Sequence, residues 1–380
     1  MAAMASNADR VFSDELVNRL TDANEYSLKG MIRGLTLPPT APLPALSSCS
    51  AASLGQLDSL PVELMHMVLV LLDVQSLVRL SQVARAAKVA VDGLPAYEDL
   101  RQHIPDVLVA LGRTRMLHCH SVACLQDALR ASPPRCASCL VSFGGFLFLP
   151  TCERVCFDCL CENRALRMTT PALARECFRL SASQLAAGVP VLHTIPGSYS
   201  VRWHKHHPKV HKLVSVRQAK AHAAVVHGSA QAVAALLPAT KPASWSLRKY
   251  YLLQSFHEAP LGPAGRDLTL LPEQDNTAPD GFGGVASIRM PYVGKAGKAD
   301  RGRCCNGCRI LEKLDADGGL PENVKTRLVP PGVPASKPLK ALGTRLYTEG
   351  KFVQHIRECY GVTRLLSLWD DGVKDPYGLE

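Results

Sequence analysis

The chain has 380 residues, of which 47% are hydrophobic and 20% charged, a composition typical of a soluble globular protein. Forty-three Lys and Arg against 33 Asp and Glu leave a formal net charge of +10, which favours phosphate or acidic protein surfaces as partners without choosing between them. No positively charged start is followed by an apolar stretch, and no apolar run is long enough to span a bilayer. We therefore expect a cytoplasmic or nuclear protein with no membrane segment. There, 14 cysteines would be metal ligands and buried thiols rather than disulfides.

Residues 1–56 are predicted to be a flexible N-terminal segment. They begin with Ala, Ser and Asn and pass through a proline-rich stretch at 37–44. Proline at this density blocks the hydrogen bonds of helices and of strands alike. We expect one short helix near Phe12 to Leu20.

A helical module is predicted at residues 57–100. Pro61 suits a first helical turn, and Glu63 lies where the helix dipole favours negative charge. The run from Leu64 to Leu72 is apolar almost all round, and Leu77 and Leu80 recur at helical spacing. A hairpin this small can bury such a surface only against a partner, so we expect another polypeptide to cover it.

This module resembles an F-box, the short helical domain by which substrate receptors join cullin-RING ubiquitin ligases. The matching residues are Leu60-Pro61-Val62-Glu63-Leu64, Val68, Leu69, Leu72, Asp73, Ser76-Leu77, Leu80, Val83 and Arg85. The tryptophan that many F-boxes carry after the Val-x-Arg step is absent, and Lys88 stands near its place. The resemblance implies a Skp-type adaptor as partner, with the adaptor-facing or module-core positions Leu60, Pro61, Leu64, Val68, Leu77, Leu80 and Val83.

Residues 101–258 are predicted to form a helical and zinc-knuckle region. Two cysteine pairs of i, i+3 spacing, Cys136 with Cys139 and Cys156 with Cys159, are separated by 16 residues. Four thiolates at this spacing are typical of a closed, structural zinc site, and the stretch 143–150 between them predicts a turn and a short strand. Cys152 or Cys161 could replace a neighbouring ligand. Small helices are expected at 170–178 and 181–187, and the order of an F-box followed by a Cys-rich knuckle resembles F-box proteins of filamentous fungi.

Residues 259–303 are rich in Pro, Gly and charge and predict a loop or linker, followed by a C-terminal knuckle and helix at 304–380. Cys305 and Cys308 form another i, i+3 pair, and His355 and Cys359 lie one helical turn apart. Together they could make a second zinc site, of three cysteines and one histidine, across 46 intervening residues, with Cys304 as an alternative to Cys305. The competing interpretation is that His355 and Cys359 are ordinary core residues of an amphipathic helix.

The sequence does not assign a function to a histidine-rich stretch at 203–211. Its members are Trp203, His204, His206, His207 and His211. Histidine runs of this kind are more often solvated loops than metal sites. The neighbouring basic residues Lys205, Lys209, Lys212 and Arg217 could instead contact nucleic acid.

The motifs of common enzymes are missing: the chain has no P-loop, no G-x-G-x-x-G, no G-x-S-x-G and no H-E-x-x-H. We therefore predict a mainly α, non-enzymatic protein: an F-box module, then a small α+β zinc-stapled region, then a C-terminal helical segment. Its function would be to recruit an unidentified protein to a cullin-RING ligase. The alternative is a zinc-stabilised, basic nucleic-acid-binding regulator. A ligase with its own RING is disfavoured, because the first cysteine cluster lacks the interleaved second ligand set.

Overall fold

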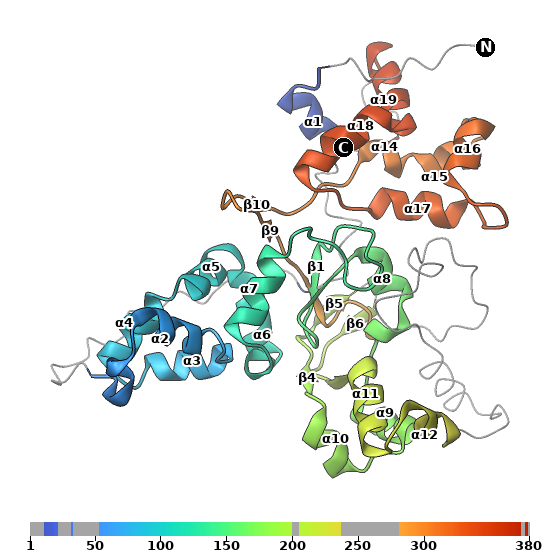
Figure 1. Cartoon of the computed structure of the whole chain (residues 1–380). Coiled ribbons are helices and arrows are strands. Elements are labelled where there is room, and N and C mark those ends of the chain that lie inside the picture. The colour runs from blue at the N-terminus through green and yellow to red at the C-terminus, as the bar shows by residue number, and fades with distance from the viewer. Residues whose placement is uncertain are drawn as a thin grey trace.

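The computed structural model describes residues 11–21, 32, 53–199, 205–236, 281–373 and 377–378. Helices supply most of the regular structure in these residues, and the strands form sheets of two or three members (Figure 1). The predicted mainly α class is confirmed. None of the described helices is long and apolar enough to cross a membrane.

A series of short helices follows the N-terminal segment. They are η3 (Gly55–Ser59), α2 (Val62–Leu69), α3 (Val74–Ser81), α4 (Arg85–Asp92), α5 (Pro95–His103), α6 (Pro105–Arg113), η4 (Leu117–Cys119) and α7 (Val122–Arg130). The carboxylate of Asp73 caps α3 by accepting a hydrogen bond from the Ser76 amide at 2.8 Å. In Figure 1, α2, α3 and α4 lie to one side of the molecule, away from the C-terminal helices.

The turn between α2 and α3 docks on the start of α7. The Val122 amide donates to the Leu72 carbonyl at 3.1 Å, and the Ala123 amide donates to the Val70 carbonyl at 2.9 Å. A single hydrophobic cluster extends from Leu69 on α2 through Leu125 on α7 to the central sheet. The first helices and the central sheet therefore share one core.

The central sheet corrects the prediction for residues 259–303. It contains β1 (Phe146–Phe148), β2 (Glu153–Val155) and β8 (Ser287–Arg289), in the order β2-β1-β8 with both pairings antiparallel. Residues 259–280 lie outside the described residues, but 281–303 are not a linker, because β8 supplies the third strand. The composition of this segment did not reveal β8, because the strand has only three paired residues. Its middle residue, Ile288, pairs with Leu147 of β1.

One buried arginine holds this sheet to its surroundings. Arg154 on β2 is 3% exposed. Its guanidinium donates hydrogen bonds to four carbonyl oxygens at 2.8–3.0 Å, those of Ala128, Gly144, Met290 and Pro291. The end of α7, the approach to β1 and the segment after β8 therefore meet at one side chain.

A small α+β unit follows the central sheet. Its elements are α8 (Phe157–Glu162), η5 (Arg164–Leu166), β3 (Met168–Thr169), α9 (Pro171–Phe178), α10 (Ala182–Gly188), β4 (Leu192–His193), β5 (Gly197–Tyr199), β6 (Lys205–His207), β7 (Lys212–Ser215), α11 (Val216–Val226) and α12 (Ala230–Ala235). Strands β3 and β4 flank β7, and β5 pairs with β6. Helices α9, α10 and α11 pack around the fully buried Phe178 in a core of their own.

The C-terminal helices form the third core of the described chain. After the β9 (Tyr292–Val293) and β10 (Ala299–Asp300) pair come α14 (Asn306–Arg309), α15 (Leu311–Ala316), α16 (Glu322–Leu328), α17 (Ser336–Thr344), α18 (Glu349–Glu358) and α19 (Tyr360–Asp370). Helix α1 (Asp14–Leu20) buries Val17 and Leu20 in this same core. Helix α1 lies where the short helix near Phe12 to Leu20 was expected, and its i, i+3 apolar pair packs against helices about 300 residues away in the chain.

Candidate adaptor-binding face and metal centres

An apolar stripe is exposed along α2 and the turn after it. Leu64, Met67, Val68 and Leu71 are 47%, 64%, 47% and 71% exposed. Their i, i+3, i+4, i+7 spacing places them on one side of the helix, while Leu69 on the opposite side is buried in the shared core. The surface that the sequence predicts to need a partner is thus uncovered in the isolated chain.

The predicted adaptor-contact residues divide into exposed and buried positions. Pro61, Leu64, Val68 and Val83 are exposed, whereas Leu60 and Leu80 are half-buried. Leu77 is fully buried and belongs to the core of the module. Sequence reasoning did not single out Met67 and Leu71, although the helical period that contains Leu64 and Val68 passes through both.

The first metal centre gathers the four predicted cysteines. The sulfurs of Cys136, Cys139, Cys156 and Cys159 all lie within 4.8 Å of one another, and all four residues are buried. Ligand sulfurs about 2.3 Å from a central zinc lie about 3.8 Å apart in a tetrahedron, and Sγ of Cys139 and Sγ of Cys156 are 3.9 Å apart. The geometry and the all-thiol donor set therefore fit zinc.

Local backbone geometry shapes both knuckles of this centre. The Leu140 amide donates to the Cys136 carbonyl at 2.8 Å, and Leu140 adopts a positive φ of 61° that closes the first turn. Cys156 is the N-cap of α8, where its sulfur accepts a hydrogen bond from the Cys159 amide at 3.5 Å. Each turn directs its two cysteine sulfurs to the same side, and both turns lie next to the β1–β2 pair.

The crowded sulfurs cannot all ionise without a cation. Contact with the other thiols, Cys136 first, holds the pKa of Cys139 well below its usual range. Contact with Cys136 and Cys139 raises the pKa of Cys156 and of Cys159. A divalent cation would remove this conflict by neutralising the thiolates, because metal-bound thiols are deprotonated.

The second centre gathers Cys305, Cys308, His355 and Cys359, whose ligand atoms also lie within 4.8 Å of one another. Sγ of Cys308 is 3.1 Å from Nε2 of His355 and 3.7 Å from Sγ of Cys359. The ring of Tyr347 stacks on the His355 imidazole with 4.2 Å between centroids, which holds the imidazole in place. A donor set of three thiols and one imidazole fits zinc.

Two glycines allow the second centre to form. A Cβ on Gly361 would overlap the Gly307 carbonyl oxygen, and a Cβ on Gly307 would overlap the Val362 amide nitrogen. Backbone therefore touches backbone where α14 meets the start of α19. This contact brings the Cys305–Cys308 turn next to Cys359.

The alternative ligands lie elsewhere. Cys304 is directed to the Thr344 carbonyl at 3.8 Å, and Cys161 belongs to none of the metal-ligating groups among the described residues. Cys152 belongs to a third group, with His120 and Cys124. Sequence reasoning missed this group, although His120 and Cys124 have the same i, i+4 spacing as His355 and Cys359.

The described part of the histidine-rich stretch, residues 205–211, contributes to an aromatic cluster. Trp203 and His204 lie outside the described residues. His207 is buried and stacks on Phe282 with 5.5 Å between ring centroids. The rings of His207 and His211 form a T-shaped pair with 5.4 Å between centroids. His206 is exposed and bonds the Ser198 hydroxyl at 3.0 Å. No metal-ligating group of three includes these histidines among the described residues.

One neighbouring basic side chain is already engaged by the protein itself. Arg217 forms a two-bond ion pair with Glu153 at 2.6 and 3.0 Å. Lys209 and Lys212 are exposed. The nucleic-acid interpretation of this stretch stays a prediction.

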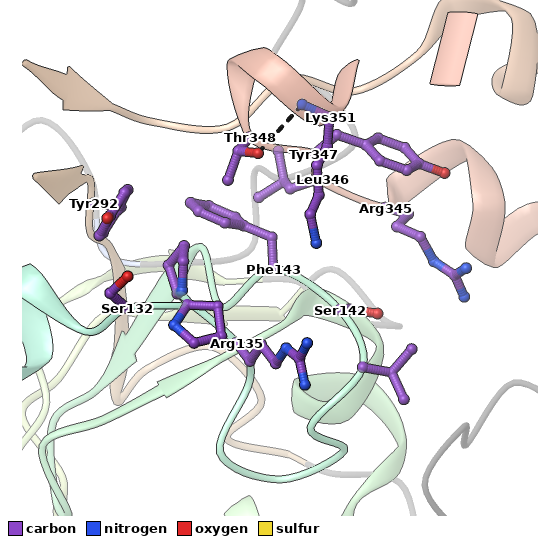
Figure 2. Close-up of a pocket in the computed structure, with 13 residues that line it drawn as sticks. Ser132, Arg135, Ser142, Phe143, Tyr292, Arg345, Leu346, Tyr347, Thr348 and Lys351 are labelled. Carbon is purple, nitrogen blue, oxygen red and sulfur yellow. Dashed lines mark hydrogen bonds between the residues drawn. The ribbon is translucent and has the colours of Figure 1, made fainter. Parts of the chain in front are cut away.

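A hollow of about 390 Å³ lies between the residues that flank the first knuckle and the segment that leads into α18. Its lining combines residues around the first knuckle, including Arg135 and Phe143, with residues leading into α18, including Tyr347 and Lys351. Figure 2 shows Phe143 between Lys351 and Arg135 in this view. Among the described residues that line it, three are basic and none is acidic.

The helices α2, α3 and α4 and the start of α5 coincide with a known domain. Residues 57–99 match the family model described as the F-box domain. The chain therefore contains an F-box domain, and F-box proteins are substrate receptors of cullin-RING ubiquitin ligases. No curated protein and no solved structure matches the chain. The similarity in layout to F-box proteins of filamentous fungi stays a prediction.

Proposed function

We propose that this protein is a non-enzymatic substrate receptor of a cullin-RING ubiquitin ligase. Its F-box domain binds a Skp-type adaptor, and the part of the chain that zinc stabilises recruits a protein for ubiquitin transfer by other subunits. The observation that carries this proposal is the exposed stripe of Leu64, Met67, Val68 and Leu71 on the F-box domain. A cytoplasmic or nuclear location, where thiols stay reduced, suits the cysteine-based metal centres.

The stripe is large enough to supply useful binding energy. Fully burying a large apolar side chain contributes about 1.5–3 kcal/mol relative to leaving it exposed. About half of each of the four side chains remains to be covered, so their burial would contribute roughly 4 kcal/mol in total. This corresponds to about a thousandfold in affinity. Apolar anchors at i, i+3, i+4 and i+7 are those of a helix that lies in an apolar groove.

A pull-down with purified Skp-type adaptor tests the proposal. In the double variant Leu64→Asp, Met67→Asp, two charges would have to be desolvated in the interface, so we expect affinity to fall by at least about 100-fold. Leu77 is unsuitable for this test, because a charge at a fully buried position would unfold the module.

The matched control is Val225→Asp, which places the same charge on an apolar residue of α11 that is 77% exposed and far from the F-box. The control should bind the adaptor as wild type does. Both variants should keep the wild-type zinc content and helical circular dichroism. Equal retention of wild type and the double variant would refute adaptor binding through this stripe.

A further inference from the structure

We propose that His120, Cys124 and Cys152 form a third metal site, one that binds zinc. Their ligand atoms all lie within 4.8 Å of one another. None of the three belongs to the first or the second metal centre. Two thiols and an imidazole are the donors that zinc prefers, and three protein ligands are sufficient for a zinc site with one open position.

The backbone brings these three side chains together from two separate segments. Ser121 caps α7 by accepting a hydrogen bond from the Cys124 amide, which fixes His120 just before the helix and Cys124 within its first turn. Cys152 lies in the turn between β1 and β2 with a φ of 56°. Residues other than glycine adopt this left-handed conformation at an energetic cost, and such strain is often found at functional sites.

A buried hydrogen bond prepares His120 to act as a ligand. Nε2 of His120 lies 2.5 Å from the Leu149 carbonyl oxygen, and the residue is 7% exposed. A carbonyl can only accept, so Nε2 carries the proton and Nδ1 keeps its lone pair for a metal. Imidazoles that bind metals nearly always donate their other N–H to such an oxygen.

The site has access to solvent on one side. An open hollow of about 470 Å³ is lined by Cys124, Cys152 and Asp127, with Asp127 one helical turn after Cys124. A water from this hollow completes the coordination. This zinc is therefore more accessible to chelators than the ions of the two closed centres, and it should leave first.

The site lies where the F-box domain meets the central sheet. The His120 carbonyl accepts a hydrogen bond from the Val74 amide at 3.3 Å, at the start of α3. Cys152 belongs to the turn that joins β1 to β2, and Cys156 of the first metal centre directly follows β2. A metal bound here clamps the F-box domain to the body. If the proposed receptor function holds, this clamp fixes the orientation of the recruited protein relative to the adaptor.

Zinc analysis of the purified full-length chain tests the site. Wild-type protein should contain three zinc ions per chain, one for each group of ligands. Cys124→Ser and Cys152→Ser should each contain two. Cys119→Ser, which removes a neighbouring thiol outside the group, should still contain three. The same zinc content in wild type and in both serine variants, or a disulfide between Cys124 and Cys152 in protein purified under reducing conditions, would overturn the proposal.

Two further measurements keep the test decisive if a serine variant folds poorly. With a mild chelator, wild-type protein should release one zinc in a fast phase and two in a slow phase. Cobalt-substituted wild type should lose part of its thiolate-to-cobalt absorption in that fast phase. A single release phase for all of the zinc would count against a third, accessible site. None of these readouts depends on adaptor binding.

The hollow between the first knuckle and α18 supports a second inference, which is independent of the third metal site and rests on the proposed function. We infer that it binds an acidic, extended segment of the recruited protein. Arg135 and Lys351 both line the hollow and are exposed, with Phe143 between them in the view of Figure 2, and none of the described lining residues is acidic. A carboxylate-bearing peptide with one central apolar residue would satisfy both the charge and the aromatic surface.

Fluorescence anisotropy with a labelled Glu-Glu-Leu-Glu-Glu peptide tests this second inference. Wild-type protein should bind it at physiological salt, and Arg135→Glu, Lys351→Glu should weaken binding by at least about tenfold. A Lys-Lys-Leu-Lys-Lys peptide should not bind. Equal binding of both peptides, or complete displacement of the acidic peptide by single-stranded RNA at low concentration, would overturn the inference. This assay contains no adaptor, so a failure of peptide binding can be distinguished from a failure of adaptor binding.

Discussion

Replacing Arg154 with Met should destabilise the central body strongly. The guanidinium is buried and donates to four carbonyl oxygens, which belong to the end of α7, the approach to β1 and the segment after β8. Burial lowers the pKa of Arg154 to about 10, so the group still carries its charge at neutral pH. Methionine matches the length of the apolar part of the side chain but donates no hydrogen bond.

The magnitude follows from two opposing effects. Hydrogen bonds from a charged donor contribute about 1.5–3 kcal/mol each, so the four bonds together contribute roughly 6–12 kcal/mol. Desolvation of a buried cation costs several kcal/mol, and methionine avoids that cost. The four carbonyls would, however, be left buried without this donor. We expect a net loss of about 3–5 kcal/mol in the free energy of unfolding, the range found when a buried charge network is broken.

Urea denaturation combined with hydrogen exchange of the β1 and α7 amides measures this loss. The matched control is Arg217→Met, which removes a half-exposed ion pair with Glu153 and should cost about 1 kcal/mol or less. A loss below about 1 kcal/mol for Arg154→Met would refute the reasoning, because it would mean that the four hydrogen bonds only balance the desolvation of the cation.

Three further outcomes are expected. Zinc removal by a strong chelator at neutral pH should unfold the central and C-terminal regions, because a structural zinc contributes about 10 kcal/mol or more. Thermal melting that is unchanged after chelation would contradict the two closed centres. Acidification should release zinc as well, since the thiolates regain protons. Gly361→Ala should lower stability by about 1–3 kcal/mol or more in thermal melts, because its Cβ would overlap the Gly307 oxygen, whereas Gly350→Ala, with nothing within 4 Å, should be neutral or stabilising. In gel-shift assays at low salt we expect no binding to duplex or single-stranded probes, and binding that weakens steeply with added salt would favour the nucleic-acid alternative.

The sequence alone determined those features that depend on local spacing. An i, i+3 cysteine pair places two sulfurs on one turn whatever surrounds it, so the two knuckles were visible without a structure. The Leu-Pro start and the apolar ridge of the F-box are likewise contained in one short segment, 57–99. The exposed stripe on α2 follows from the same local period, because a helix that is apolar all round cannot bury every side within so small a module.

Only the tertiary structure decided which distant segments meet. Cys152 is close in sequence to the ligands of the first metal centre, yet the left-handed turn that contains it brings it to His120, just before α7, and to Cys124, within α7. Strand β8 was missed in the sequence because its three paired residues carry too little periodic signal. Helix α1 was expected from the sequence, but the core that it joins was not. Their places depend on partners more than 100 residues away, β1 for β8 and the C-terminal helices for α1. Contacts of that range arise from the packing of the whole chain, which local propensity does not contain.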